Sequence, residues 1–290
     1  MKYISILFFG ALLLSSCVRN NPKPVWLSLD KWVLEANPTQ VDDAGQLTQN
    51  LSEVWVYVDN KIIGVFELPC KIPVLVSGKD VKIQLYPAVR NNGIAATKKI
   101  YPFVEPVELT MELVEGETYV MPMVTRYYNN VEFWIEDFES PSQVKLETDD
   151  ISTTELTLDD DPAIALPGGG SYGQVHFTSS DSLWVAYTTE NQVLPQSGAE
   201  VYLEIDYRNS NSLLTGVLGI SSSSIDQNPN IALNAQDAST MSWKKIYIDL
   251  KEIVSNSTSA DYFKQYFRAI IDEGNSQSDI YIDNIKVVHF

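Results

Sequence analysis

Short runs in which apolar and polar residues alternate recur along most of this 290-residue chain, and turn-forming residues separate them. In Val201–Tyr207, for example, successive side chains fall on opposite faces of an extended strand, with the apolar ones on a single face. Asp59-Asn60 and Asn91-Asn92-Gly93 are typical of tight turns between strands. The sequence therefore predicts an all-β fold, in which only residues 250–256 have the pattern of a helical turn.

The strands are expected to form two antiparallel β-sandwich domains, because short strands at this spacing are typical of sandwiches. Residues 26–128 are assigned to a small sandwich and residues 129–290 to a larger one. The polar stretch Thr125–Asn130 marks the boundary between them. A chain of this length is long enough for two domains that each bury a core.

The N-terminus has the features of a secretory signal, with Lys2, a short apolar run and then Leu14-Ser15-Ser16-Cys17. Those four residues resemble the bacterial lipobox, which consists of a leucine, two small residues and a cysteine. The resemblance implies a lipoprotein signal peptide over residues 1–16, a lipid on Cys17 and a lipidated tether over residues 17–25. An ordinary signal peptide or a short membrane anchor is the alternative, although a membrane span needs about 20 apolar residues.

Lipidation of Cys17 predicts a place in the cell envelope, with the membrane as a partner through the N-terminal lipid. Val18 stands where enteric bacteria use an aspartate for inner-membrane retention, which favours the outer membrane and leaves the exposed side open. Cys70 then has no disulfide partner and is expected to be a buried, inert thiol. The formal net charge of −18 disfavours nucleic acid and anionic lipid head groups as ligands.

Part of the first domain resembles the PEGA-type surface domain. The residues that carry the resemblance are Val58–Gly64, Leu68-Pro69, Val76–Gly78 and Val81–Ile83. They follow that family's order of a strand, a short turn, a glycine early in the next strand, a proline, and a glycine turn before an alternating strand. The resemblance implies a spacer or scaffold module and assigns no catalytic residue.

The second domain resembles the galactose-binding-type jelly roll of many carbohydrate-binding modules. Phe133–Glu139 matches the first strand of that fold, Trp243–Leu250 a late strand, and Ile280–Val287 the last strand. The resemblance covers nearly the whole domain and implies a jelly roll. The same fold serves sugar binding, protein contact and spacing, so the fold alone does not assign a ligand.

The jelly-roll resemblance also implies a structural calcium ion that joins the first and last strands. The matching positions are Glu136, Glu139 and Asp283. The apolar phase shifts at Asp283-Asn284, which predicts a β-bulge where carbonyl groups can turn toward an ion. Calcium takes six to eight oxygen ligands, so the backbone would supply several of them. A solvated acidic edge is the alternative.

A glycan-binding face is expected on the side of the strands opposite their apolar face. Sugar sites combine aromatic rings with polar groups that bind hydroxyls. Residues of these types at such positions are Trp184, Tyr202, Glu204, Asp206 and His176. Each of them alone is more often a covering or partly buried side chain than a ligand contact. As an exposed cluster they would suit a neutral polysaccharide, because the acidic chain repels polyanions.

Catalysis is not expected. His176 and His289 are the only histidines, and the chain has no His-Glu-x-x-His motif. The sequence thus favours a lipid-anchored, non-catalytic envelope protein whose jelly roll binds a glycan. Two alternatives stay open, namely a structural or docking subunit of an envelope assembly and a small glycan hydrolase.

Overall fold

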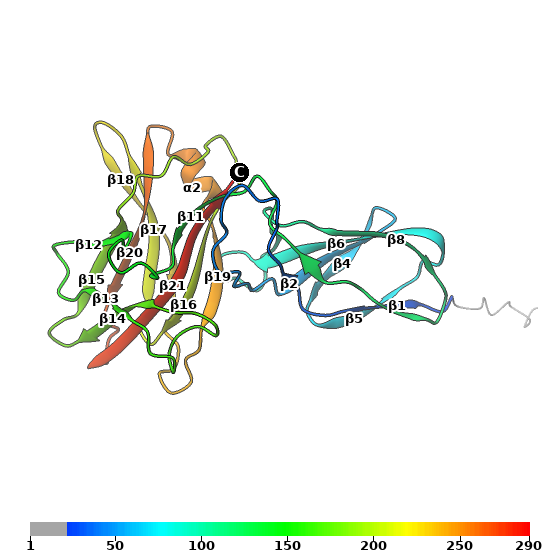
Figure 1. Ribbon diagram of the computed structural model, residues 1–290, viewed down its shortest axis with the longest axis horizontal. Coiled ribbons are helices and arrows are strands. Elements are labelled where there is room, and N and C mark those ends of the chain that lie inside the picture. Colours follow the sequence, from blue (N-terminus) through cyan, green and yellow to red (C-terminus); the bar gives the residue numbers. More distant parts are fainter. Residues whose placement is uncertain (1–21) are drawn as a thin grey trace, which may run out of the picture.

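The computed structural model describes residues 22–290, so the expected signal peptide, Cys17 and most of the tether lie outside the described residues. Figure 1 shows two lobes arranged end to end in an elongated molecule. We call residues 22–128 the N-terminal lobe and residues 129–290 the C-terminal lobe. The all-β fold is confirmed, and the one helix in the described part of the chain is the predicted turn, α2 (Lys251–Asn256). None of the helical structure among residues 22–290 has the length and apolarity of a membrane span.

The N-terminal lobe is a small sandwich of two main sheets. The three-stranded sheet contains β5 (Cys70–Val74), β1 (Val25–Leu29) and β9 (Thr118–Val120). The five-stranded sheet contains β4 (Lys61–Glu67), β3 (Glu53–Val58), β6 (Gly78–Arg90), β7 (Lys98–Ile100) and β8 (Val107–Leu113). A short pair is formed by β2 (Val33–Leu34) and β10 (Val124–Thr125). The lobe is not purely antiparallel, because β1 pairs with β9, and β2 with β10, in parallel.

The sequence of β3 explains its place in the lobe. Val54, Val56 and Val58 point into the core and are at most 1% exposed, while the intervening residues face outward. The predicted tight turn at Asp59-Asn60 is confirmed, and both residues have the positive φ angles that a type I′ turn requires. Cys70 is a free thiol but only half-buried, so the expected full burial is wrong. Its partial burial still raises the pKa of the thiol, which keeps it protonated at neutral pH.

The C-terminal lobe is a jelly-roll sandwich of two antiparallel sheets. The first, which we call the inner sheet, contains β13 (Leu156–Asp159), β14 (Tyr172–Thr178), β21 (Gln277–His289), β16 (Val201–Asn209) and β19 (Lys244–Asp249), with β11 (Glu132–Glu136) added beside β21. The second, the distal sheet, contains β12 (Leu146–Thr148), β15 (Leu183–Thr188), β20 (Tyr262–Ile270), β17 (Leu213–Ile220) and β18 (Ile225–Leu233). Large apolar side chains fill the space between the two sheets.

The predicted bulge in the last strand is confirmed. Between Glu204 and Asp206 the register of β16 against β21 shifts, so that Glu204 lies opposite Lys286 and Asp206 opposite Asp283. One extra residue of β21 is accommodated there, and Asn284 has a positive φ of 44°. The bulge places several polar side chains of β21 and β16 beneath the N-terminal lobe.

The two lobes share a core rather than touching only at their surfaces. Tyr101 of the N-terminal lobe packs against Tyr202 and Tyr247, with ring centroids 5.4 and 4.8 Å apart. A single hydrophobic cluster contains residues of both lobes. The predicted boundary at residues 128/129 lies between β10 and β11, where the chain leaves the sheets of one lobe for those of the other.

Candidate functional site

The structure corrects the expected position of Trp184. Its side chain is fully buried between the sheets of the C-terminal lobe, stacked on Phe267 with ring centroids 6.3 Å apart. Alternate residues of β15 therefore face the opposite way to the prediction, and Leu183 and Tyr187 are the partly exposed ones. Both faces of β15 are largely apolar, so alternation alone could not identify the core face.

The expected exposure of Tyr202, Glu204 and Asp206 is also wrong. The three residues do share the outer face of β16, as predicted, but none is more than 3% exposed. The N-terminal lobe covers this face. The polar residues on this face of β16 contact the other lobe. The alternation of polar and apolar residues in a strand cannot distinguish such a contact from contact with water.

His176 is exposed but lies apart from that cluster. Its Nδ1 atom is 2.8 Å from Oδ1 of Asp279 on the neighbouring strand β21. Strand β14 pairs with the start of β21, whereas Tyr202 pairs with Val288 at its end. The structure therefore does not bring His176 together with the other predicted ligand residues.

The residues predicted to hold calcium are engaged with backbone amides. Glu136 is buried and accepts hydrogen bonds from the amides of Phe138, at 2.6 Å, and Lys145. Glu139 accepts one from Ser171, and Asp283 one from Asn284. Among residues 22–290 no group of three or more His, Cys, Asp or Glu side chains is arranged to hold a metal ion. The calcium ion stays a prediction.

A hollow of about 770 Å³ lies between the two lobes, beside the edge strand β19. Trp243, Tyr207 and Ile246 of the C-terminal lobe line it, and Asn50 and Arg90 line it from the N-terminal lobe. Among the predicted ligand residues, Asp206 reaches this hollow. Pockets of a few hundred to 1,000 Å³ at domain interfaces are the usual place for small-molecule sites.

Two further hollows continue the first along β19. One of about 480 Å³ shares Gly93, Tyr207 and Lys244 with it. The other, of about 440 Å³, shares Asn92 and Asn230 with the second. We call the three together the interlobe groove. It follows the side of the jelly roll where β18 and β19 end their sheets.

Amide side chains are unusually frequent in the interlobe groove. They are Gln49, Asn50, Asn91, Asn92, Asn230 and Asn234. Each amide group offers both hydrogen-bond donors and acceptors. The amide nitrogen of Asn230, a residue that lines two of these hollows, is buried and has no hydrogen-bond partner in the described part of the chain.

An aromatic and apolar surface completes the lining. Trp243 is half-buried, and its indole Nε1 donates a hydrogen bond to the carbonyl of Ile164 at 2.5 Å, which fixes the orientation of the ring. Tyr172 packs edge-on against this indole with ring centroids 6.2 Å apart. Tyr207 is also half-buried. A fixed tryptophan ring beside several amides is an arrangement that suits a ligand with apolar faces and many hydroxyl groups.

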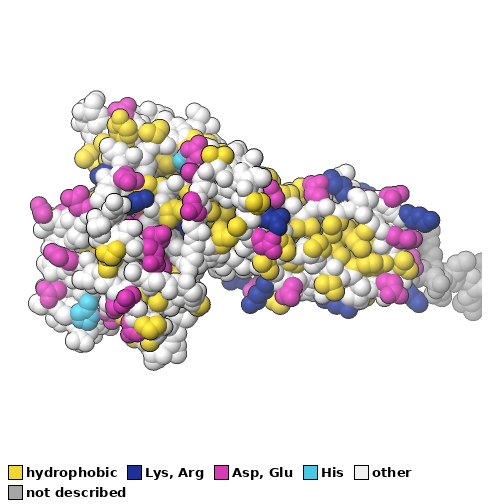
Figure 2. All heavy atoms as spheres, viewed as in Figure 1, with side chains coloured by type: hydrophobic (Ala, Val, Ile, Leu, Met, Phe, Trp, Pro, Cys, Tyr) yellow, Lys and Arg dark blue, Asp and Glu magenta, His cyan; other side chains and the backbone are white. Residues whose placement is uncertain are grey.

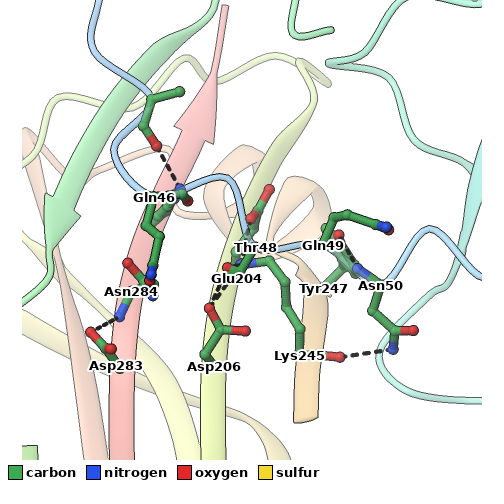
Figure 3. Close-up of polar contacts among 12 residues, drawn as sticks. Gln46, Thr48, Gln49, Asn50, Glu204, Asp206, Lys245, Tyr247, Asp283 and Asn284 are labelled. Atoms are coloured by element: carbon green, nitrogen blue, oxygen red, sulfur yellow. Dashed lines mark hydrogen bonds and ion pairs between the residues drawn. The ribbon is translucent and has the colours of Figure 1, made fainter. Parts of the chain in front are cut away.

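A buried charged network lies behind the groove (Figure 3). Lys245 Nζ is 2.9 Å from a carboxylate oxygen of Glu204 and 3.4 Å from one of Asp206. Burial raises the pKa of Glu204, but the nearby lysines outweigh it and hold that pKa below its usual value. Burial likewise lowers the pKa of Lys245, and the two carboxylates outweigh it in the opposite direction. Glu204 and Lys245 are therefore ionised at neutral pH.

The N-terminal lobe supplies the remaining partners of this network. Tyr101 and Tyr127 donate hydrogen bonds to Glu204, the latter at 3.0 Å. Thr48 donates to Asp206, and Figure 3 shows the segment that carries it passing across the strands of the inner sheet. Lys286 donates to the carbonyls of Ala44 and Gln46 in the same segment. The ion pairs lie within the inner sheet, and the N-terminal lobe supplies further hydrogen-bond partners to Glu204, Asp206 and Lys286.

The N-terminal lobe also covers the free edge of β19. Asn50 donates to the carbonyl of Lys245 at 3.1 Å, and the amide of Asn92 donates to the carbonyl of Tyr247 at 2.9 Å. The Asn92 side chain accepts from the amide of Asp249. The residues Asn91–Gly93 predict a turn from their sequence, but nothing in that pattern indicates which strand the turn contacts.

Comparisons with known proteins identify fold relatives only. Neither a protein-family model nor a curated protein matches the chain. Similar solved structures include the CBM22-1–GH10 modules of a Clostridium thermocellum xylanase, complexed with xylohexaose (13% identity, 50% of this chain and 26% of that one, TM-score 0.35). The chain thus spans only about a quarter of that structure.

Two other similar structures are single domains. The family 11 carbohydrate-binding module of the C. thermocellum cellulase Lic26A-Cel5E is 13% identical over 53% of this chain and 92% of that one, with a TM-score of 0.36. The K1 cleaved adhesin domain of Lys-gingipain from Porphyromonas gingivalis is 13% identical over 54% and 97%, with a TM-score of 0.37. At such low identities and TM-scores, none of these similarities assigns a ligand or a residue role.

Proposed function

We propose that this protein is a lipid-anchored, non-catalytic glycan-binding protein of the cell envelope, and that the interlobe groove holds a neutral polysaccharide. The observation that carries the proposal is the lining of the groove, where the fixed Trp243 ring lies among amide side chains. An indole stacks on the apolar face of a sugar ring. Amides donate to and accept from sugar hydroxyls, which themselves do both.

The charges along the groove support a neutral ligand. Asp206 is paired with Lys245, and Asp249 with Lys99 at 2.8 Å. Arg90 is paired with Glu53 and Glu67. Paired charges of this kind leave little local field for the recognition of a charged ligand. The same pairing supports a non-catalytic role, because carboxylates held by lysines are poorly placed to exchange protons with a substrate.

The position of the start of the described chain supports an anchoring role. Figure 1 shows the chain entering at the end of the N-terminal lobe that lies farthest from the C-terminal lobe. A lipid on Cys17 would therefore hold the N-terminal lobe near the membrane and present the jelly roll away from it. Replacing Cys17 by Ala should release the protein from the membrane fraction and abolish fatty-acid labelling. Labelling that survives the substitution would contradict lipidation at this residue.

Binding in the groove is tested with the purified full chain and three neutral probes, namely mixed-linkage β-glucan, xylan and mannan. Trp243→Ala should weaken binding of the preferred probe at least tenfold, equivalent to about 1.4 kcal/mol. Trp26→Ala is the matched control and should bind normally, because Trp26 lies on β1 of the three-stranded sheet and does not line the groove. Isothermal titration calorimetry measures both.

A second variant separates binding from stability. Asn230→Ala removes an amide nitrogen that makes no hydrogen bond within the described residues, so it should weaken binding without lowering the melting temperature. If Trp243→Ala and Asn230→Ala both bind like the unmodified protein, the groove is not the site. If none of the probes binds at all, the glycan proposal fails, and a structural or docking subunit of an envelope assembly becomes the favoured function.

A further inference from the structure

Three aromatic side chains lie together on the outer face of the five-stranded sheet of the N-terminal lobe. Trp55 on β3 is directly opposite Tyr86 on β6, and Tyr57 is the next outward residue of β3. The rings of Tyr57 and Tyr86 meet edge to face, with centroids 5.5 Å apart. Strand β4 adds Val65 and Ile62 beside them. We call these five residues the aromatic face.

The aromatic face is not part of the core of the lobe. The core is filled by the alternate residues of β3, and none of the five side chains belongs to the shared hydrophobic cluster. Ile62 is 54% exposed, and the three aromatic residues are each partly exposed. Figure 2 shows hydrophobic side chains gathered on the N-terminal lobe on the face in view, between charged groups. An apolar patch that the fold leaves uncovered often marks an interaction site.

The accessible part of Trp55 is apolar. Its indole Nε1 is buried and has no hydrogen-bond partner among residues 22–290, although the residue as a whole is partly exposed. The ring therefore presents carbon rather than its N–H to solvent. A ring surface of this kind is suited to stacking against the apolar face of a ligand.

The charges around the aromatic face neutralise one another. Lys82 Nζ is 3.2 Å from Glu108, and Arg90 bridges Glu53 and Glu67 at 3.0 and 2.8 Å. Gln84 donates to Glu108 and to the hydroxyl of Tyr86. The rim thus offers hydrogen-bonding groups without an unpaired charge among those side chains, which matches an uncharged, hydroxyl-rich ligand better than a charged peptide.

We propose that the aromatic face is a second binding surface, distinct from the interlobe groove, and that it takes a neutral polysaccharide. Trp55, Tyr57 and Tyr86 supply the stacking surface, and the tyrosine hydroxyls add hydrogen-bonding groups. The two surfaces are fixed relative to each other because the lobes share a core. One polymer chain or two neighbouring chains that meet both surfaces would be held by avidity, which raises retention above either single affinity.

The test compares Trp55→Ala with the groove variant Trp243→Ala, using soluble mixed-linkage β-glucan, xylan and mannan in calorimetry and in affinity electrophoresis. Trp55→Ala should remove one class of site and lower retention in the polymer gel at least tenfold. Trp55→Tyr, which keeps an aromatic ring, should restore part of it. Trp26→Ala should change nothing. Ile62→Arg blocks the face from an exposed position and should reproduce the loss without unfolding the lobe.

The outcomes separate this proposal from that of the groove. Loss of binding in Trp55→Ala and Ile62→Arg but not in Trp243→Ala supports the aromatic face and overturns the groove. Unchanged binding in both Trp55→Ala and Ile62→Arg overturns the proposal for the aromatic face, regardless of the binding measured for Trp243→Ala. Self-association in sedimentation that Ile62→Arg abolishes, with glycan binding unaltered, identifies the face as a contact between copies of this chain and also overturns the proposal.

Discussion

Lys245 balances the charge of the buried carboxylates of the C-terminal lobe that lie beneath the N-terminal lobe. It is 7% exposed and faces two carboxylates that are themselves buried. Replacing such a pair as a whole is often neutral, whereas removing one partner leaves a buried charge without compensation. The role of Lys245 is therefore best measured by deleting it alone.

Lys245→Met should lower the free energy of unfolding by about 3–5 kcal/mol, because Glu204 and Asp206 would lose their shared ammonium group. Lys244→Met is the matched control, since Lys244 is exposed on the neighbouring position and should change stability by less than about 0.5 kcal/mol. Urea titration followed by tryptophan fluorescence gives both values. Equal stabilities of the two variants would contradict the assigned role.

Lys286 predicts a dependence of stability on pH. Burial, together with the charge of Lys245, lowers its pKa to about 8 in the folded protein, from 10.5 in the unfolded chain. Between these values the unfolded chain binds a proton that the folded protein does not, so stability should rise as the pH rises from 8 to 10.5. Above pH 10.5 the Lys286 amine is neutral in both states, and the stability gained there is lost as the pH falls through 8.

The measurement is the slope of unfolding free energy against pH in the protein and in Lys286→Met. The unmodified protein should gain stability relative to the variant over the range from pH 8 to 10.5. Parallel curves would show that Lys286 titrates normally. Tyrosine ionisation at high pH affects both proteins alike, so it cancels in the comparison.

At the residue scale, the sequence predicted which side chains of β16 share a face but not what covers that face. Tyr202, Glu204 and Asp206 alternate with buried apolar residues, as a strand requires. Alternation reports a difference between two faces and is silent on whether the polar one meets water or another lobe. Their partners, such as Thr48 and Tyr101, lie more than 100 residues away in the chain, and no local pattern connects them.

At the scale of elements, local patterns were sufficient for turns and bulges. The Asp59-Asn60 turn and the bulge at Asp283-Asn284 follow from short-range rules about φ and side-chain phase. The edge of β19 did not follow from such rules. Its free carbonyls are bound by Asn50 and Asn92, and the identity of an edge strand depends on the order of the whole sheet.

The calcium prediction also belongs to this scale, because it concerns the junction of β11 and β21. If Glu136, Glu139 and Asp283 help to hold an ion, addition of a chelator should lower the melting temperature, and restored calcium should raise it again. An ion at about 100 times its dissociation constant stabilises the folded state by about 2.7 kcal/mol. No change with chelator, together with no calcium in elemental analysis, would contradict the prediction.

At the scale of the whole molecule, the contact between lobes resembles a domain interior more than a hinge. Tyr101 and Phe103 pack on Tyr202, and the ionised side chains beneath them are satisfied by residues of both lobes. Separating the lobes would expose this aromatic cluster and leave the β19 edge uncovered. The molecule is therefore expected to move as one elongated body, with the groove held open at a fixed width.

This arrangement predicts one cooperative unfolding transition for the full chain. Glu204 and Lys286 lose hydrogen-bond partners in the N-terminal lobe when that lobe unfolds, so partial unfolding carries the cost of unsatisfied groups as well as of exposed aromatic surface. Differential scanning calorimetry should show a single peak. Lys245→Met should lower the temperature of this single peak, because Glu204 and Asp206 lose their shared ammonium group. Two separate peaks in the unmodified protein would show that the lobes unfold independently. In that case the groove would have no fixed geometry, and a glycan that binds there would have to raise the melting temperature of both peaks together by bridging the lobes.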